Sequence, residues 1–272
     1  MKTMKKTAKL LLAFAVGCVV AACTQRMTAS PDDVEINEKN FPDPNFRQYL
    51  LTQEYGTDSL LTPDELKTVT LMEINNTNIS DLTGIKHFTA MTVLNCRRTQ
   101  ALKSIDVSGC TKLRYLECDG NELEALNVKG CTALQYINCA RNRIVRLDLS
   151  TCAALRFIDC RNNQLAQLNI SNTPALDALL CSHNQLTRLD ASGHPALTTM
   201  DCSHNRITHL DIEDCPTLGL LYCAGNPLTG IDLTGCPSLT RIYCDSKLRN
   251  TLDTSANPRL KFMDPDDRAA TD

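Results

Sequence analysis

A solenoid with one long parallel sheet is the fold class that the sequence predicts, and three observations predict it. A segment of 21 residues recurs six times between Leu113 and Ser238. In each copy, apolar residues fill the first, fourth and eleventh positions, and cysteine fills the sixth. Asparagine fills the ninth position. Self-similarity at one fixed period is typical of coils that stack on their neighbours and share a continuous core.

The repeated pattern L-x-x-L-x-C-x-x-N-x-L resembles the leucine-rich repeat in its cysteine variant. The resemblance implies one short strand per coil, stacked in a parallel β-sheet on the concave face. Strand alternation directs positions 1, 4 and 6 into the core and positions 2, 3 and 5 outward. We expect the asparagine column, from Asn121 to Asn226, to hydrogen-bond turn backbone, and asparagine tolerates a left-handed conformation where the chain bends.

The return path of each coil has about ten residues, which is too short for a strand return plus a full helix. The sequence therefore predicts extended segments and turns on the convex face. Alternating apolar residues, such as Leu147 and Leu149, favour a short strand there.

The N-terminus combines lysines with an apolar run of thirteen residues that ends at Cys23. This pattern predicts a secretory signal over residues 1–22, because the run is too short for a permanent membrane span. V-A-A-C resembles the bacterial lipoprotein processing box, which implies cleavage before Cys23 and a lipid on that residue. The alternative is an ordinary export signal with a chance cysteine. Residues 23–35 are polar and predict a flexible tether.

Residues 36–69 predict a helical N-terminal cap. Asp43-Pro44 and Thr62-Pro63 are helix-start signals, and each precedes residues that suit a short helix. The two segments resemble the caps of bacterial surface leucine-rich-repeat proteins of the internalin-like class. Relatives of that cap often carry a calcium-like loop, but YGTDSL lacks the ligand spacing, so we expect no calcium site.

The repeat domain is predicted over residues 70–264, and residues 265–272 form a polar tail. The last coil has Lys247 where the ninth-position asparagine is expected. No long C-terminal cap follows, so this open coil is a candidate contact for oligomers or for assembly with another envelope protein.

Fifteen cysteines in an exported chain would normally indicate disulfides. Here they fall into two columns that follow the repeat frame, and Thr173 and His194 occupy two places in the second column. The favoured interpretation is free, buried thiols that act as small apolar side chains. The net charge of −3 gives no electrostatic case for nucleic acid.

Catalytic patterns are weak. His183 and His204 share the eighth position of consecutive coils, which could place them near one metal ion, but repeat duplication explains them better. Asp159 and Asp201 are two strands apart, about 9.6 Å, which resembles the spacing of an inverting glycosidase pair. No pocket is predicted around them. We therefore predict no enzyme activity, no catalytic residue, no metal and no cofactor.

The predicted binding site is a row of aromatic residues at the third position, flanked by charged and polar residues. Such a composition is typical of interface hot spots and of sugar-stacking platforms, although an aromatic row can also serve only cross-strand packing. The candidate partner-binding residues are Arg114, Tyr115, Glu117, Tyr136, Asn138, Arg141, Arg156, Phe157, Asp159, Tyr222 and Tyr243.

These features predict a lipid-anchored protein of the cell envelope, at the outer membrane or cell surface. Its predicted function is adhesion or recognition of a protein or a surface glycan. A structural subunit of an envelope complex is the main alternative, and a surface hydrolase is a remote one.

Overall fold

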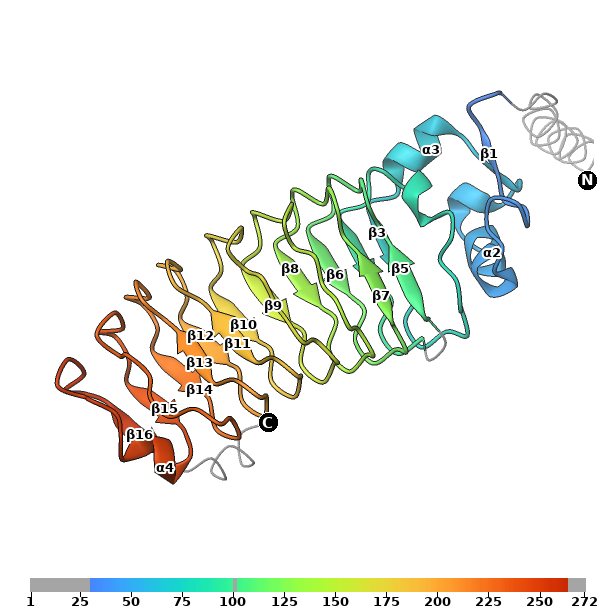
Figure 1. The fold of residues 1–272 in the computed structure, drawn as a ribbon. Coiled ribbons are helices and arrows are strands. Elements are labelled where there is room, and N and C mark those ends of the chain that lie inside the picture. The colour runs from blue at the N-terminus through green and yellow to red at the C-terminus, as the bar shows by residue number, and fades with distance from the viewer. Residues whose placement is uncertain (1–29, 100–101, 264–272) are drawn as a thin grey trace, which may run out of the picture.

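A computed structural model describes residues 30–99 and 102–263 of the chain. These residues form one elongated leucine-rich-repeat solenoid, with the N-terminal cap at one end and successive coils side by side along its length (Figure 1). The predicted fold class is therefore confirmed. The predicted signal, Cys23 and the polar tail lie outside the described residues. Within the described residues, no helix has the length and apolar character needed to cross a membrane.

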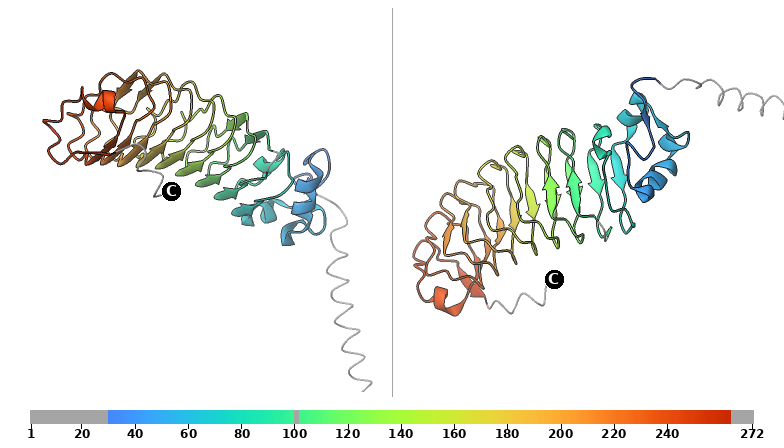
Figure 2. Two further views of the ribbon diagram at one scale, coloured as in Figure 1. Left: turned by 90° about the horizontal axis from the view of Figure 1, so that it is seen from below. Right: turned by 45° about the vertical axis from the view of Figure 1, so that its right-hand side comes forward.

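Ten parallel strands form the main sheet, which runs along one side of the solenoid (Figure 2). Each strand has three residues, and in the nine strands from β3 to β15 the middle residue is buried because the core-facing fourth position lies there. In order, the strands are β3 (Leu71–Glu73), β4 (Val93–Asn95), β6 (Tyr115–Glu117), β8 (Tyr136–Asn138), β9 (Phe157–Asp159), β10 (Ala178–Leu180), β12 (Thr199–Asp201), β14 (Leu220–Tyr222), β15 (Arg241–Tyr243) and β16 (Lys261–Met263).

The back of the solenoid carries four short strands in two parallel pairs, β5 with β7 and β11 with β13. Their bounds are Ser104–Asp106, Ala125–Asn127, Arg188–Asp190 and His209–Asp211. The predicted back strand thus forms in these four coils. In the coils that contain residues 146–148, 167–169 and 230–232, the same positions form no strand.

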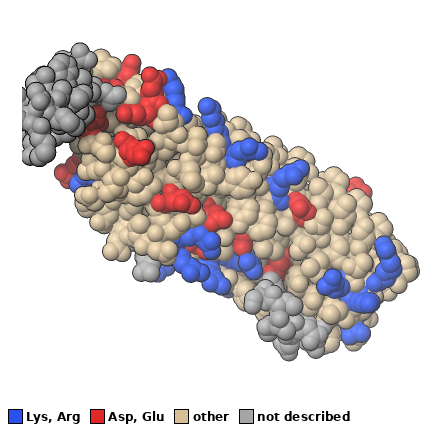
Figure 3. Space-filling model, turned by 180° about the vertical axis from the view of Figure 1, so that it is seen from behind, with Lys and Arg blue, Asp and Glu red and all other residues tan. Residues whose placement is uncertain are grey.

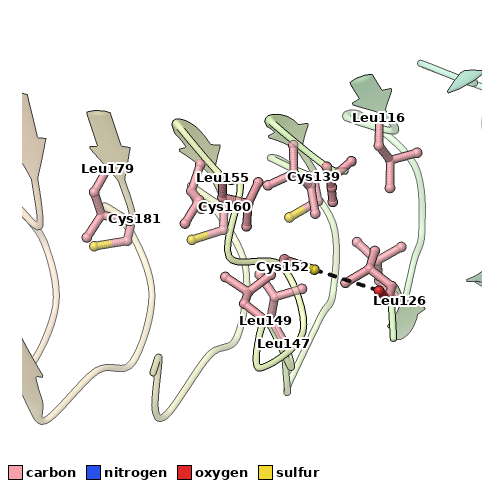
Figure 4. Packing of buried hydrophobic residues seen from close by; sticks show 14 of the residues in the cluster. Leu116, Leu126, Cys139, Leu147, Leu149, Cys152, Leu155, Cys160, Leu179 and Cys181 are labelled. Atoms are coloured by element: carbon pink, nitrogen blue, oxygen red, sulfur yellow. Dashed lines mark hydrogen bonds between the residues drawn. The ribbon is translucent and has the colours of Figure 1, made fainter. Parts of the chain in front are cut away.

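The core consists of stacked side chains from successive coils (Figure 4). All thirteen cysteines of the described part are buried and have free thiols. Back-column thiols donate to a backbone carbonyl of the preceding coil, as Cys131 Sγ does to Val107 O at 3.2 Å. His194 occupies the same column and places Nε2 3.1 Å from the carbonyl oxygen of Ile170. A buried histidine can thus replace a thiol because it reaches the same acceptor.

The asparagine column forms a hydrogen-bonded ladder. Asn163 Nδ2 donates to the carbonyls of Cys139 and Cys160 at 3.0 and 3.1 Å, and its Oδ1 accepts from the N–H of Ile144 at 2.9 Å. The left-handed conformation falls one residue earlier than expected, at the eighth position, where Asn162 has a φ of 54°. The ninth-position side chain must point inward to reach these carbonyls, so the bend occurs before it.

The N-terminal cap joins the first coil through one buried carboxylate. Asp43 Oδ1 accepts from the N–H groups of Asn45 and Phe46, both at 2.8 Å, and so caps helix α2. Asp43 Oδ2 accepts from the N–H and hydroxyl of Ser80, at 2.8 and 2.7 Å, and from the N–H of Asp81 at 3.2 Å. These bonds outweigh the effect of burial and lower the pKa of Asp43. The cap elements are β1 (Val34–Glu35), α2 (Pro44–Leu51), η1 (Glu54–Gly56), β2 (Leu60–Leu61) and α3 (Pro63–Thr68). The short helix η2 (Ile85–His87) follows β3 in the first coil.

Both ends of the repeat domain differ in detail from the sequence expectation. The sequence predicts that residues 34–35 belong to the tether, but they form β1, which pairs antiparallel with β2. At the other end, helix α4 (Ser246–Arg249) replaces the missing asparagine turn and buries Leu248. The last coil is one residue shorter than the repeat, so Phe262 aligns with core-facing Ile242 instead of extending the third-position row. The guanidinium of Arg249 lies over the Phe262 ring, 4.8 Å from its centroid.

Candidate binding surface

The outward face of the ten-stranded sheet, which we call the sheet face, carries most of the predicted binding residues. The third position of the repeat is the first residue of each strand, and in β6, β8 and β9 it is Tyr115, Tyr136 and Phe157. The strand register aligns these three residues. The ring centroids of Tyr115 and Tyr136 are 6.1 Å apart. Those of Tyr136 and Phe157 are 4.6 Å apart, with ring planes only 5° from parallel. The structure therefore brings the three rings into one row, while their role in binding stays a prediction.

Asp159 differs from the expected exposed acid. Its side chain is buried, and Arg161 Nη2 lies 2.8 Å from its Oδ2, with Arg161 Nε at 3.0 Å from Oδ1. Position 5 faces outward in this strand, but the long Arg161 side chain folds back from the strand exit and covers the carboxylate. Asp159 is therefore a supporting residue beneath the surface, and Arg161 is the group that solvent meets.

A charged network that the sequence analysis missed lies beside the first two aromatic rings. Arg97 Nε is 2.7 Å from Asp119 Oδ1, and Arg97 Nη1 is 3.4 Å from Glu117 Oε2. Asn138 Nδ2 donates to Asp119 Oδ1 at 3.2 Å. The charge of Asp119 is the main reason that the pKa of Arg97 is raised. Arg97 and Asp119 occupy the seventh position of adjacent repeats, directly after the core cysteine. This shared position is the feature of the sequence from which their ion pair could have been predicted.

The charges of Arg97, Glu117 and Asp119 also act on the phenol of Tyr136. Burial, followed by the carboxylates of Glu117 and Asp159, raises its pKa. The hydroxyl therefore stays protonated over the physiological range and can donate a hydrogen bond at the surface.

The remaining predicted cations occupy two different places. Arg114 and Arg156 are exposed at the second position, on the side of the aromatic row where the chain enters each strand. Arg141 lies at the left-handed eighth position, with a φ of 56°, and so belongs to the exit turns. On the face seen in Figure 3, basic and acidic side chains are interspersed among large uncharged areas.

A separate pair of aromatic residues lies at the fifth position of the repeat, which is the last residue of each strand: Tyr222 in β14 and Tyr243 in β15. Their ring centroids are 4.3 Å apart and the planes differ by 19°. Tyr243 is buried, with 8% of its surface exposed, so it supports Tyr222 instead of offering its own ring to a partner. The expected exposure of Tyr243 is therefore wrong, because the stacked neighbour covers it.

The weak catalytic patterns gain no support from the geometry. Asp201 is fully buried and accepts from the N–H and hydroxyl of Ser203 at 3.1 and 2.6 Å, while Asp159 is covered by Arg161. The rings of His183 and His204 stack at 4.4 Å, 10° from parallel, so their in-plane lone pairs do not converge on one point. Across the described residues, no group of three or more His, Cys, Asp or Glu side chains is arranged to hold a metal ion.

Comparison with known sequences identifies the repeat family. The model of the endo-β-N-acetylglucosaminidase EndoS leucine-rich-repeat domain matches residues 41–184, which is more than half of the chain. The chain belongs to this family. No curated protein matches the chain in sequence.

Solved structures of leucine-rich-repeat proteins share the fold of the chain. Internalin C2 from Listeria monocytogenes superposes with a TM-score of 0.62 and 21% identity, over 80% of this chain and 100% of the internalin chain. A leucine-rich-repeat protein from Leptospira interrogans gives 0.56 and 16% identity, over 74% of this chain and 63% of that one. The functional domain of InlJ from Listeria monocytogenes, described as including a cysteine ladder, gives 0.49 and 26% identity, over 87% and 62%. The chain thus spans slightly less than two thirds of the InlJ and Leptospira structures.

Proposed function

We propose that this chain is a lipid-anchored cell-surface protein that binds a partner protein through its sheet face. The observation that carries the proposal is the row of Tyr115, Tyr136 and Phe157 on the outward side of the sheet. Tyr115 is 45% exposed, although burial of such a ring would be favourable. Exposed aromatic residues with arginine beside them are the composition of interface hot spots.

The ring geometry favours a protein over a glycan. A sugar that stacks on an aromatic residue needs a free ring face. Tyr136 and Phe157 instead turn their faces toward each other, at 4.6 Å, and so present ring edges to solvent. Ring edges and flanking arginines suit apolar side chains and carboxylates of a protein partner.

Leucine-rich-repeat solenoids supply extended surfaces for protein binding, which is consistent with this use of the sheet. A rigid sheet also loses little conformational entropy when a partner binds. We propose that the chain acts by binding alone and has no catalytic activity.

The binding proposal is tested with the full chain on cells that produce it. Tyr136→Ala and Arg156→Glu should each reduce chemical cross-linking to a surface partner by at least tenfold, while the melting temperature changes little. Val145→Ser is the matched control, because Val145 is 51% exposed but lies away from the sheet face. If the two sheet-face variants capture the same partners as the control, the proposal is wrong.

The anchor rests on the sequence V-A-A-C at residues 20–23 and on the apolar run before it. We propose that Cys23 is acylated and holds the solenoid at the outer membrane or cell surface. Cys23→Ser should abolish incorporation of labelled fatty acid and release the chain from the membrane fraction. Proteinase added to intact cells should digest the wild-type chain. Continued labelling of the variant would contradict the lipid, and protection from proteinase would contradict surface exposure.

A further inference from the structure

An apolar stripe crosses the sheet face at right angles to the strands. The register of β3, β4, β6, β8, β9 and β10 aligns their first residues, so one third-position side chain per coil lies in the row. We call this row the apolar stripe, and its residues are Leu71, Val93, Tyr115, Tyr136, Phe157 and Ala178. Leu71 is 52% exposed and Tyr115 is 45% exposed. Of the three large apolar side chains that are exposed in the described part, two therefore belong to the stripe.

The two sides of the stripe carry opposite charge. Arg114 and Arg156 are exposed on the second-position side, and within the described residues neither forms an ion pair. On the fifth-position side, Glu73 is exposed, and Glu117 and Asp119 share the single cation Arg97. Asp177 is also exposed on the second-position side, next to β10, and Arg98 is exposed on the other side, after β4. The two arginines leave the second-position side net basic, and Glu73, Glu117 and Asp119 leave the other side net acidic over the first three coils.

We infer that the apolar stripe is the docking site for an amphipathic α-helix of a partner protein, lying along the solenoid axis. This inference rests on the proposed function and names the structural class of the partner. The second-position and fifth-position columns are three residues apart, or about 10 Å along a strand. This width matches the diameter of a helix with its side chains, about 10–12 Å.

The length of the stripe sets the length of the helix. Six strands at about 4.8 Å span about 24 Å, which corresponds to about 16 helical residues at 1.5 Å each. The helical pitch of about 5.4 Å is close to the strand spacing, so apolar residues at i, i+3, i+4 and i+7 can meet successive stripe residues. Acidic residues on one flank of the helix would face Arg114 and Arg156, and basic residues on the other would face Glu73 and Glu117.

An extended segment fits the stripe less well. Side chains on one face of a strand repeat at about 6.6–6.8 Å, which does not match the strand spacing of about 4.8 Å. Five of the six stripe strands lie inside the sheet, and β3 starts it beside the cap, so the backbone groups along the row are engaged with neighbouring strands. An added strand could pair only at the outer edge of β3 and not along the row.

Three synthetic 16-residue peptides with one leucine face test the inference on the full chain. The mixed peptide carries glutamate on one flank and lysine on the other, the all-lysine peptide carries lysine on both, and the proline peptide has two central prolines that prevent a helix. The mixed peptide should bind and gain helical circular dichroism. The other two should bind at least tenfold more weakly, because one flank meets like charge or the helix cannot form.

Variants of the chain locate the binding. Tyr115→Ser should weaken binding of the mixed peptide at least tenfold, whereas the control Val145→Ser should leave the affinity for the mixed peptide unchanged. In the double variant Arg114→Glu with Arg156→Glu, the all-lysine peptide should bind more tightly than the mixed one. The inference is overturned if the mixed peptide does not bind, if the proline peptide binds equally well, or if Tyr115→Ser has no effect.

Failure of this inference is distinguishable from failure of the proposed function. If sheet-face variants abolish cross-linking to the cellular partner but the mixed peptide neither binds nor competes, the partner uses another structure and the proposed function stands. If the variants leave cross-linking intact, the sheet face is not the binding surface and the proposed function fails.

Discussion

Each ninth-position asparagine satisfies backbone groups of two adjacent coils with one side chain. Asn163 bonds two carbonyls and one N–H, all of them in positions that the core-facing arc shields from water. This explains why asparagine fills the ninth position in all six repeats between Leu113 and Ser238.

Removal of this side chain should therefore destabilise the solenoid. We expect Asn163→Ala to lower the free energy of unfolding by at least about 2 kcal/mol, because buried groups lose their partners. Its neighbour Asn162 is exposed at the left-handed eighth position, where glycine is unstrained, so Asn162→Gly should change stability by less than about 1 kcal/mol. Urea unfolding measures both. Equal effects of the two substitutions would show that the ladder does not hold the coils.

The buried thiols make stability depend on alkaline pH. Burial raises the pKa of Cys131 from its ordinary value of 9.0 to about 12. A raised folded-state pKa means that the stabilisation is complete below pH 9 and is lost as pH rises toward 12, since only the unfolded state releases the proton there. Cys131→Val should reduce the slope of stability against pH by about 1.4 kcal/mol per unit in this window. The measurement is urea unfolding at a series of pH values, and an unchanged slope would contradict free buried thiols.

At the scale of elements, the cap is attached through a carboxylate that serves two segments. Asp43 caps α2 and also binds the turn at Ser80 and Asp81. Asp43→Ala should cost about 2–4 kcal/mol and should speed amide exchange at Ser80 and Asp81 before other coils respond.

Acid should reproduce this effect. Because the folded-state pKa of Asp43 lies below the ordinary value of 3.8, its contribution is present above pH 3.8 and is lost as pH falls through the lowered value. The Asp43→Ala variant should lack that acid-dependent step. Fast exchange spread evenly over all coils would instead indicate that Asp43 holds no particular junction.

The strands of the main sheet could be predicted because their residues repeat in a fixed register. The exceptions lie where the register breaks. A spacing of 21 residues would place Phe262 on the sheet face, but the last coil, which contains α4, is one residue shorter, so Phe262 aligns with core-facing Ile242. The sequence predicts a left-handed conformation at the ninth position, such as Asn163, but it occurs at the eighth, such as Asn162, because the repeat pattern shows which residue type recurs and not which peptide unit bends.

At the scale of the molecule, the repeat period of the sequence predicts the position of each side chain on the solenoid. It does not predict which charged side chains form ion pairs. The row of Tyr115, Tyr136 and Phe157 followed from the 21-residue spacing. The burial of Asp159 under Arg161 did not follow, because long charged side chains choose among many rotamers according to their neighbours. The network of Arg97 was missed for the same reason, and it lies in a coil of irregular length.

Site-specific photo-cross-linking on intact cells is the most direct test of whether a partner protein contacts the sheet face. A photoreactive phenylalanine analogue replaces Tyr115 in one full-length chain and Val145 in another, two positions of similar exposure on different faces. We expect a discrete covalent adduct with a protein from position 115 and none from position 145. An adduct that forms only from position 145, or equally from both, would contradict partner contact at the sheet face.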